Sequence, residues 1–280
     1  MHLPRLNEAQ RELVHAWFPR CVLVDDLAWG VIDTAVLRLR WGDVDVVVKA
    51  SQSGNHHIQR EITAHEQMLG PWAGRAPELL HADRELSVLA TRYLHGRLVE
   101  SDPVLRDDPE VHRQAGELLA LLHDQGVELD DSYERRMDAR AVEWLDGSHR
   151  IGAEAESRLR ELLTDNRYEP ARMVPTHGDW QPRNWLWRNG VVYVIDLGRA
   201  ERRPAQTDLA RLAYQQWRDQ PELEEAFVAG YGGDPREPQT WKMVRLREAV
   251  GTAAWASRVG DAEYEEQGHR MIAEVLADLT

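Results

Sequence analysis

The stretch that decides the fold reads T-H-G-D-W-Q-P-R-N-W-L-W over residues 176–187 and continues as V-V-Y-V-I-D-L-G over residues 191–198. It places Asp179, Asn184 and Asp196 around an apolar hairpin. Each of these residue types is common in turns, but the whole set, with an apolar strand ending in Asp196, is more specific than any one member. Phosphoryl transfer needs one group to orient a hydroxyl and two to hold magnesium, and this set supplies all three.

The composition is that of a globular protein. The chain has 280 residues, of which 42% are hydrophobic and 29% charged, enough for one large domain or two smaller ones. The net charge is −14 and no block is rich in Lys or Arg, which argues against a nucleic-acid binder. An acidic surface suits a cationic small molecule, or simply keeps the protein in solution.

Other global features predict the location of the protein. No apolar segment approaches the length of a membrane span, and the N-terminal residues lack the apolar stretch of a signal peptide. Cys21 is the only cysteine, so no internal disulfide can form. We therefore expect a cytoplasmic protein that binds neither membrane nor nucleic acid, either as a monomer or as a homodimer.

The apolar periodicity changes near residue 95, which predicts an α+β fold with two lobes. Residues 1–95 are expected to form a five-stranded antiparallel sheet with one key helix, and residues 96–280 a larger, mainly helical lobe. The predicted strands are 22–27, 36–39, 44–48, 79–81 and 86–93, and the predicted helices are 5–17, 54–69, 111–123, 137–145, 153–163 and segments from 207 onward. A hairpin is predicted around Asn189-Gly190, and residues 174–184 are predicted to be a loop.

The pattern H-G-D-x-x-x-x-N followed by I-D-x-G resembles the aminoglycoside phosphotransferase and choline kinase group, relatives of the protein kinases. The resemblance implies a two-lobed, protein kinase-like fold that uses ATP or GTP with Mg²⁺. It makes Asp179 the catalytic base, and Asn184 and Asp196 the metal ligands. His177 is expected to fix the loop by hydrogen bonds rather than to carry a proton.

The strand V-V-V-K, residues 46–49, resembles the kinase strand V-A-I-K, whose lysine contacts the α- and β-phosphates. A lysine that follows three valines on a central strand is unusual, because lysines mostly lie on exposed faces. Its partner should be a glutamate on the next helix. Glu61 and Glu66 both qualify by position, and Glu61 matches the family's pattern better.

The expected nucleotide loop departs from the kinase pattern. Gly30 is the only glycine in residues 28–34. Backbone N–H groups near Asp33 and Thr34 are expected to face the phosphates, with a plain hairpin turn as the alternative. No Walker A sequence occurs in the chain, which argues against a P-loop kinase.

The expected hinge follows the strand that ends near Ala90. By the resemblance, Thr91 lies behind the purine base, and backbone groups of Arg92 and Leu94 hydrogen-bond its edge; a simple linker is the alternative.

Protein kinases commonly place a lysine two residues after the catalytic aspartate, but this chain has the uncharged Gln181 there. Three arginines are candidate sources of the missing charge, although surface arginines after a hairpin are usually only solvated: Arg183, Arg199 and Arg202.

Three functions fit these motifs. The first is an ATP- or GTP-dependent O-phosphotransferase that inactivates a small cationic antibiotic, an aminoglycoside or a basic peptide, and so confers resistance. The second is a metabolite kinase acting on choline, homoserine, methylthioribose or a similar alcohol. The third is a catalytically weak nucleotide-binding protein, against which the intact motif residues argue. Clusters of carboxylates at helical spacing more often form a solvated helix face, but they are also the candidate contacts for a cationic acceptor. These carboxylates are Asp138, Glu143, Asp146, Glu222, Glu224, Glu225, Glu263, Glu265 and Glu266.

Overall fold

The structure is a computed structural model that describes residues 3–28, 34–52, 56–72, 74–164 and 166–278. The chain forms two compact units, and each is assembled from separate stretches of sequence. The first unit is Met1–Gln125, His177–Glu201 and Glu225–Gly232, and the second is Gly126–Thr176, Arg202–Glu224 and Gly233–Thr280. The division of the chain into lobes 1–95 and 96–280 stays a prediction.

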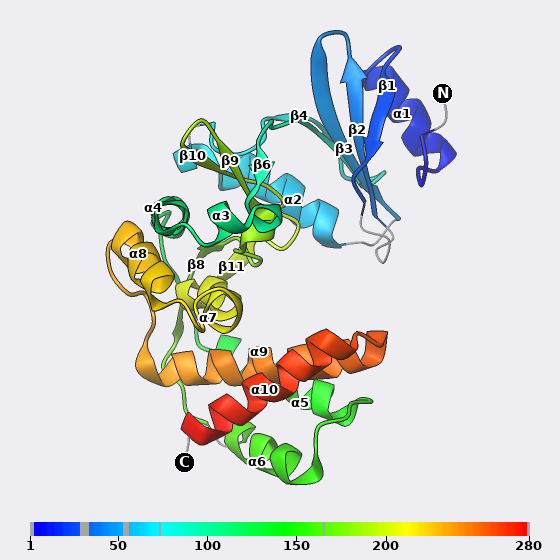
Figure 1. Cartoon of the computed structure of the whole chain (residues 1–280). Helices are drawn as coiled ribbons and strands as arrows, with labels where there is room; N and C mark the ends of the chain where they lie inside the picture. Colours follow the sequence, from blue (N-terminus) through cyan, green and yellow to red (C-terminus); the bar gives the residue numbers. More distant parts are fainter. Residues whose placement is uncertain (1–2, 29–33, 53–55, 73, 165, 279–280) are drawn as a thin grey trace. The chain divides into compact units, whose positions relative to one another are not determined.

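The first unit is built on a five-stranded antiparallel sheet in the order β1-β2-β3-β5-β4. Figure 1 labels β1, β2, β3 and β4 of this sheet. Its strands are β1 (Val22–Asp26), β2 (Thr34–Trp41), β3 (Val44–Ser51), β4 (Leu79–Asp83) and β5 (Val88–Arg92). Helix α2 (His56–Gln67) follows β3 in the chain. The predicted five strands, with one helix inserted after the third, are confirmed.

Alternation along the strands gives the two faces of this sheet different neighbours. On one face Val46, Val48 and Ala50 of β3 are buried in a core shared with Val14 of helix α1 (Glu8–Trp17). On the other face Leu89, which pairs with Lys49 across β3 and β5, packs against Ile58 and Ile62 of α2. The side chain of Lys49 therefore lies on the face that α2 covers.

The rest of the first unit carries the loop that holds Asp179 and Asn184. Its elements are β6 (Arg97–Leu98), α3 (Pro103–Arg106), α4 (Pro109–His123), β9 (Trp185–Arg188) and β10 (Val191–Val194), with the sheet order β10-β9-β6. Asn189 and Gly190 both have positive φ, 51° and 80°, as a two-residue hairpin turn requires. The predicted hairpin is confirmed.

Helix α8 (Pro221–Tyr231) supplies the last segment of the first unit. It approaches α4 so closely that a Cβ at Gly116 would lie 2.2 Å from the carbonyl oxygen of Phe227. On α8, a Cβ at Gly230 would likewise lie 1.9 Å from the carbonyl oxygen of Arg113. Because only glycine allows two helix backbones to come this near, Gly116 and Gly230 together permit the close spacing of α4 and α8.

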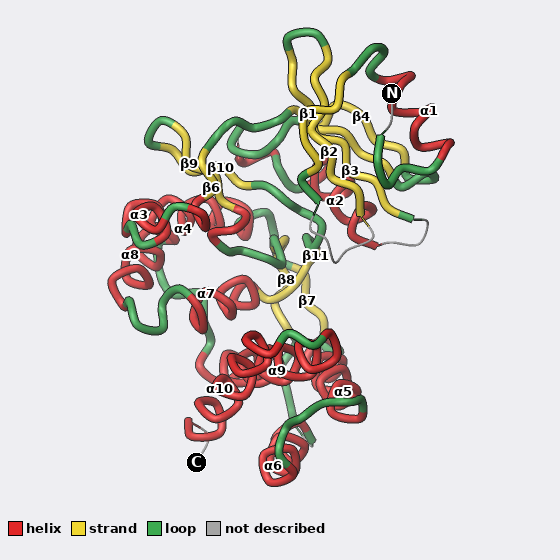
Figure 2. The backbone as a smooth tube through the Cα atoms, turned by 45° about the vertical axis from the view of Figure 1, so that its right-hand side comes forward, coloured by secondary structure: helices red, strands yellow, loops and turns green. Residues whose placement is uncertain are grey.

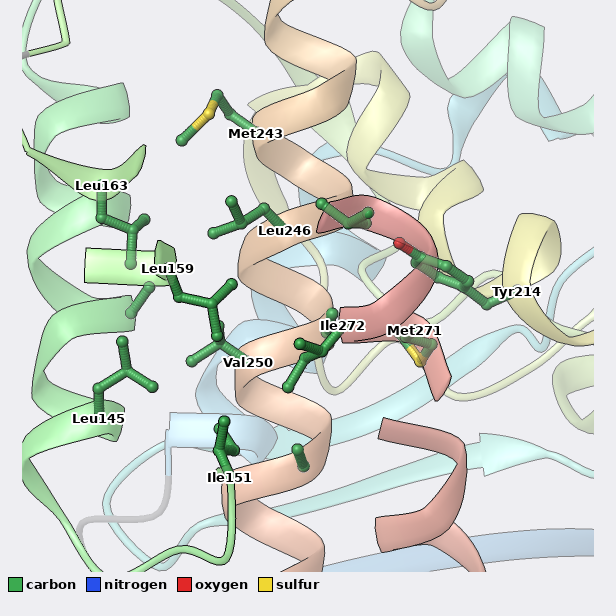
Figure 3. Close-up of a cluster of buried hydrophobic side chains, with 14 residues drawn as sticks. Leu145, Ile151, Leu159, Leu163, Tyr214, Met243, Leu246, Val250, Met271 and Ile272 are labelled. Carbon is green, nitrogen blue, oxygen red and sulfur yellow. The ribbon is translucent and has the colours of Figure 1, made fainter. Parts of the chain in front are cut away.

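The second unit is mainly helical, with a small sheet in the order β11-β8-β7, whose strands Figure 2 shows in yellow. Its elements are β7 (Glu128–Asp130), α5 (Tyr133–Asp146), α6 (Ala153–Leu163), β8 (Ala171–Thr176), β11 (Glu201–Pro204), α7 (Ala210–Gln215), α9 (Pro238–Val259) and α10 (Ala262–Asp278). In its core, Leu246 and Val250 of α9 point toward Leu159 of α6 (Figure 3). Among the described residues, no helix combines the length and the apolar composition needed to cross a membrane.

The structure differs from the sequence prediction in its short strands. Strand β8 occupies residues 171–176. The prediction of a loop is therefore wrong for residues 174–176, which belong to this strand. Strands β6, β7 and β11 were not predicted, because two to four residues carry too little alternation to separate a strand from a loop.

Candidate active site

The loop before Asp179 is held by His177 and Gly178. His177 is fully buried; its Nε2 contacts the carbonyl oxygen of Ile195 at 3.1 Å, and its Nδ1 accepts the N–H of Asp179 at 3.3 Å. Gly178 has φ +78°, a left-handed conformation that glycine adopts without steric cost. As predicted, His177 fixes the loop by hydrogen bonds.

The carboxylate of Asp179 is surrounded by donors. Gln181 Nε2 donates to Oδ1 at 2.6 Å, and Asn184 Nδ2 donates to Oδ2 at 3.1 Å. Nη2 of Arg183 reaches both oxygens, at 2.7 and 2.8 Å. The side chain of Asp179 is only 8% exposed, so its charge is held by these donors more than by water.

Asn184 is oriented by the turn that precedes it. A short 3-10 helix, η3 (Pro182–Asn184), brings its amide back to Asp179, where Nδ2 also donates to the backbone oxygen at 2.8 Å. Because the amide nitrogen is engaged twice, Oδ1 is the end of this side chain left for another ligand. The N–H of Ile195 donates to the Asn184 carbonyl at 3.0 Å, so Asn184 lies beside the strand end that carries Asp196.

Lys49, Glu61 and Asp196 form an ionic cluster. Nζ of Lys49 donates to the two carboxylate oxygens of Glu61 at 2.8 and 2.9 Å, and to Oδ1 of Asp196 at 2.8 Å. Glu61 is buried and Lys49 is half-buried, with side chains 5% and 15% exposed, whereas that of Asp196 is 51% exposed. The predicted pairing of Lys49 with Glu61 is present, and Glu66 instead pairs with Arg84 at 2.8 Å.

The cluster holds two carboxylates for one ammonium, and the pKa values follow from that imbalance. Burial raises the pKa of Glu61, against the attraction of Lys49. The positive charge of Lys49 lowers the pKa of the more exposed Asp196. Burial alone would lower the pKa of Lys49, but attraction to Asp196 and Glu61 outweighs it and raises that pKa. Lys49 therefore stays charged at neutral pH.

The backbone at Asp196 is itself unusual. Its φ is +64°, a left-handed conformation that costs a residue with a Cβ about 1 kcal/mol or more. Aspartate tolerates this region better than most residues, and strain of this kind is commonly found at functional sites. The turn aims the carboxylate of Asp196 toward Lys49.

Helix α2 contacts the segment after Asp196 at further points that the sequence did not predict. Nδ1 of His57 donates to the carbonyl of Gly198 at 2.8 Å, and Arg60 pairs with Glu201 at 2.6 Å. His57 stands four residues before Glu61, so both side chains project from the same face of the helix. The four-residue spacing from Glu61 is the sequence signal that could have identified His57 as a further contact of α2.

The nucleotide loop and the hinge are described only in part. Asp33 lies outside the described residues, and Thr34 is the first residue of β2. Thr91 is buried on β5, and Leu94 is half-buried. The N–H of Arg92 donates to the carbonyl of Glu78 at 2.8 Å, so a contact from Arg92 to a purine would use its carbonyl. The roles of these residues in nucleotide binding stay predictions.

Several candidate acceptor carboxylates in the second unit pair with arginines instead. Asp138 accepts from Nε of Arg247 at 2.8 Å and from the hydroxyl of Tyr168 at 2.8 Å, in a buried network that includes Glu134. The same holds for other members of the candidate set. The further pairs are Asp146–Arg160, Glu224–Arg236 and Glu265–Arg150. Asp138 and Glu265 are buried in these pairs, which weakens their candidacy as acceptor contacts, whereas Asp146 stays 64% exposed.

The side chains present fit a magnesium ion. Oδ1 of Asn184 and the half-exposed carboxylate of Asp196 are hard oxygen donors, the type that Mg²⁺ prefers. Among the described residues, no three His, Cys, Asp or Glu side chains are grouped as a closed metal site. Phosphoryl-transfer sites typically hold Mg²⁺ with one or two protein groups together with the phosphates.

Solved structures with a similar fold are choline kinase LicA from Streptococcus pneumoniae and a thermostable mutant of aminoglycoside phosphotransferase APH(4)-Ia in ternary complex with ADP and hygromycin B. LicA is 16% identical with a TM-score of 0.71, covering 96% of this chain and 97% of that one. The APH(4)-Ia mutant is 14% identical with a TM-score of 0.69, covering 95% and 97%. Macrolide 2'-phosphotransferase MphH from Brachybacterium faecium is 19% identical with a TM-score of 0.60, covering 90% and 91%. These similarities establish the two-lobed, protein kinase-like fold.

A comparison with curated proteins finds no match. The family model described as "Phosphotransferase enzyme family", APH, matches residues 25–245, which include Lys49, Glu61, Asp179, Asn184 and Asp196. A match over this length covers most of the chain. The chain therefore belongs to the APH phosphotransferase enzyme family.

Proposed function

We propose that this phosphotransferase moves the γ-phosphate of ATP or GTP to a hydroxyl of a small cationic molecule in the cytoplasm. The observation that carries the proposal is the bridging of Glu61 and Asp196 by Lys49, within the unit that also holds Asp179 and Asn184. A half-buried ammonium kept charged by two carboxylates is a suitable contact for nucleotide phosphates.

Each residue then has one task. Lys49 binds the phosphates, and Glu61 keeps its ammonium in place. Asp179 aligns the acceptor hydroxyl and accepts its proton, and the loop fixed by His177 holds that carboxylate in position. Asn184 and Asp196 would hold Mg²⁺, which when bound supplies charge neutralisation to the phosphates. Thr91, the Arg92 carbonyl and Leu94 would contact the base, with Asp33 and Thr34 beside the phosphates.

The acceptor we favour is an antibiotic, either an aminoglycoside or a basic peptide, because a net charge of −14 attracts a molecule with several positive charges more strongly than one with a single charge. A solved neighbour bound hygromycin B, and another is a choline kinase. A metabolic alcohol such as choline remains the second candidate, since that neighbour has the higher TM-score of the two, 0.71 against 0.69. The catalytic residues are shared by both candidates, so the acceptor must be found by assay.

The test is an ADP- and GDP-release screen against aminoglycosides, basic cyclic peptides and metabolic alcohols, repeated with Asp179→Asn. We expect the variant to lose at least about 100-fold in turnover, the usual contribution of a general base, while its Kd for ATP changes by less than about two-fold. Asp43→Asn, an exposed carboxylate in the β2–β3 turn, is the matched control and should behave like the wild type.

Two outcomes would contradict the proposal. Wild-type turnover in Asp179→Asn would remove Asp179 from the role of base. Nucleotide binding without turnover on any acceptor would favour the third function, a nucleotide-binding protein with weak activity.

A further inference from the structure

Arg183 occupies the positions on Asp179 that an acceptor hydroxyl needs. A carboxylate offers about four acceptor positions in all. Four hydrogen bonds from Gln181, Arg183 and Asn184 already reach the two oxygens of Asp179, and two of the four come from Nη2 of Arg183. A hydroxyl aligned by Asp179 therefore has to displace one of these donors.

The donor that leaves is identified by burial and by its other bonds. Gln181 and Asn184 are each 4% exposed, and the amide of Asn184 is also bonded to the backbone oxygen of Asp179 at 2.8 Å. The side chain of Arg183 is 35% exposed, and its long stem has several rotatable bonds. Of the three, Arg183 moves at the lowest cost.

The reaction also needs a positive charge near the acceptor. Charge spreads over the oxygens of the phosphoryl group during transfer, and a cation aimed at them stabilises the transition state. Lys49 is engaged with Glu61 and Asp196, and Gln181 is uncharged. Arg183 is attached to the same loop as Asp179, so it stays within reach after it is displaced.

Resting on the proposed function, we propose that Arg183 leaves Asp179 when the acceptor hydroxyl binds, and then pairs with the phosphoryl group in transfer. The hydroxyl oxygen forms a bond to the γ-phosphorus, the bond to the bridging oxygen breaks, and the nucleoside diphosphate leaves with the electron pair. The hydroxyl proton passes to Asp179. Arg183 keeps its protons throughout and contributes two parallel hydrogen bonds to the phosphoryl oxygens.

The test compares Mg-ADP binding to the full chain with and without aluminium fluoride, which mimics the phosphoryl group in transfer. A water molecule then takes the place of the acceptor hydroxyl beside Asp179. We expect aluminium fluoride to tighten ADP binding in the wild type. Arg183→Gln should lose about 100-fold of that tightening, as removal of one oxyanion donor does, with the Kd for ADP alone changed by less than about two-fold. Arg188→Gln, on an exposed arginine at the end of β9, is the matched control and should retain it.

Each outcome has one meaning. If the wild type binds no ADP, the proposed function fails. If the wild type binds ADP without tightening, or if Arg183→Gln tightens like the wild type, the role of Arg183 is wrong while nucleotide binding stands. If the glutamine variant does not fold, Arg183→Lys replaces it in the same binding comparison. It should lose about 10-fold, because an ammonium supplies charge without the planar fork of a guanidinium.

Discussion

Acid should destabilise the protein through His65, a residue of α2 four positions after Glu61. Among the described residues, Nε2 of His65 is a buried nitrogen with no hydrogen-bond partner. Burial, and then the positive charge of Lys49, lower the pKa of His65 from 6.5 to about 4. The folded protein therefore keeps this ring neutral over a pH range in which the unfolded chain protonates it.

The sign and the size of the effect follow from these two pKa values. Above pH 6.5 the ring is neutral in both states, and the full free energy of unfolding is present. Between pH 6.5 and 4 only the unfolded state takes up the proton, so stability is lost as the pH falls. With a folded pKa of about 4, lowering the pH from 7 to 5 should cost about 2 kcal/mol through His65 alone.

Urea unfolding at pH 7 and pH 5 measures this loss. Wild type and His65→Gln are compared, with His56→Gln, an exposed position on the same helix, as the matched control. The wild type and the control should both lose about 2 kcal/mol more than His65→Gln does. Burial also lowers the pKa of His112, but His112 is present in every variant and cancels from the comparison. An equal loss in the wild type and in His65→Gln would refute the reasoning.

Three further predictions concern the site and the core. Glu61→Gln leaves Lys49 with Asp196 alone and should lower the free energy of unfolding by about 3 kcal/mol, as breaking a buried ion pair does; urea unfolding within about 0.5 kcal/mol of wild type would contradict it. Asp196→Ala should abolish the strengthening of ATP binding by Mg²⁺, and titration with and without Mg²⁺ checks this; an unchanged Mg²⁺ effect would exclude Asp196 as a ligand. Gly116→Ala should lower stability by about 1–3 kcal/mol through a backbone clash, whereas Gly251→Ala, with open space around its Cβ, should not; thermal unfolding of the two variants decides.

The sequence predicts those parts of the site that rest on local spacing. Alternation along β3 turns Lys49 toward α2, and helical spacing brings Glu61 to it, so that pair was predictable. The contact between Arg183 and Asp179 was not predictable. Asp179 lies in an irregular loop and Arg183 in the short 3-10 helix after it, and there sequence spacing does not determine side-chain direction. The sequence also could not show that Asp138 is already paired. Its partner Arg247 is 109 residues away and becomes its neighbour only in the folded second unit.

In the fold, too, the elements with a strong local sequence pattern are the predictable ones. Strands of five or more residues and the hairpin at Asn189-Gly190 carry enough pattern to be predicted. Strand β11 has the sequence E-R-R-P, which reads as a polar loop, and it exists because β8 is available to pair with it. Pairing of that kind depends on tertiary context rather than on local preference.

The discontinuous composition of the first unit has a consequence for biosynthesis. The ribosome completes the five-stranded sheet and Lys49 long before it makes Asp196, which lies 147 residues further along the chain. The last piece, Glu225–Gly232, which includes residues 225–231 of α8, comes later still, and until then α4 lacks its contact with α8 at Gly116. Closing such long loops is slow compared with forming local contacts. A nascent chain therefore carries the whole sheet before it carries Asp179, Asn184 and Asp196, and the first unit is complete only after residue 232 has left the ribosome.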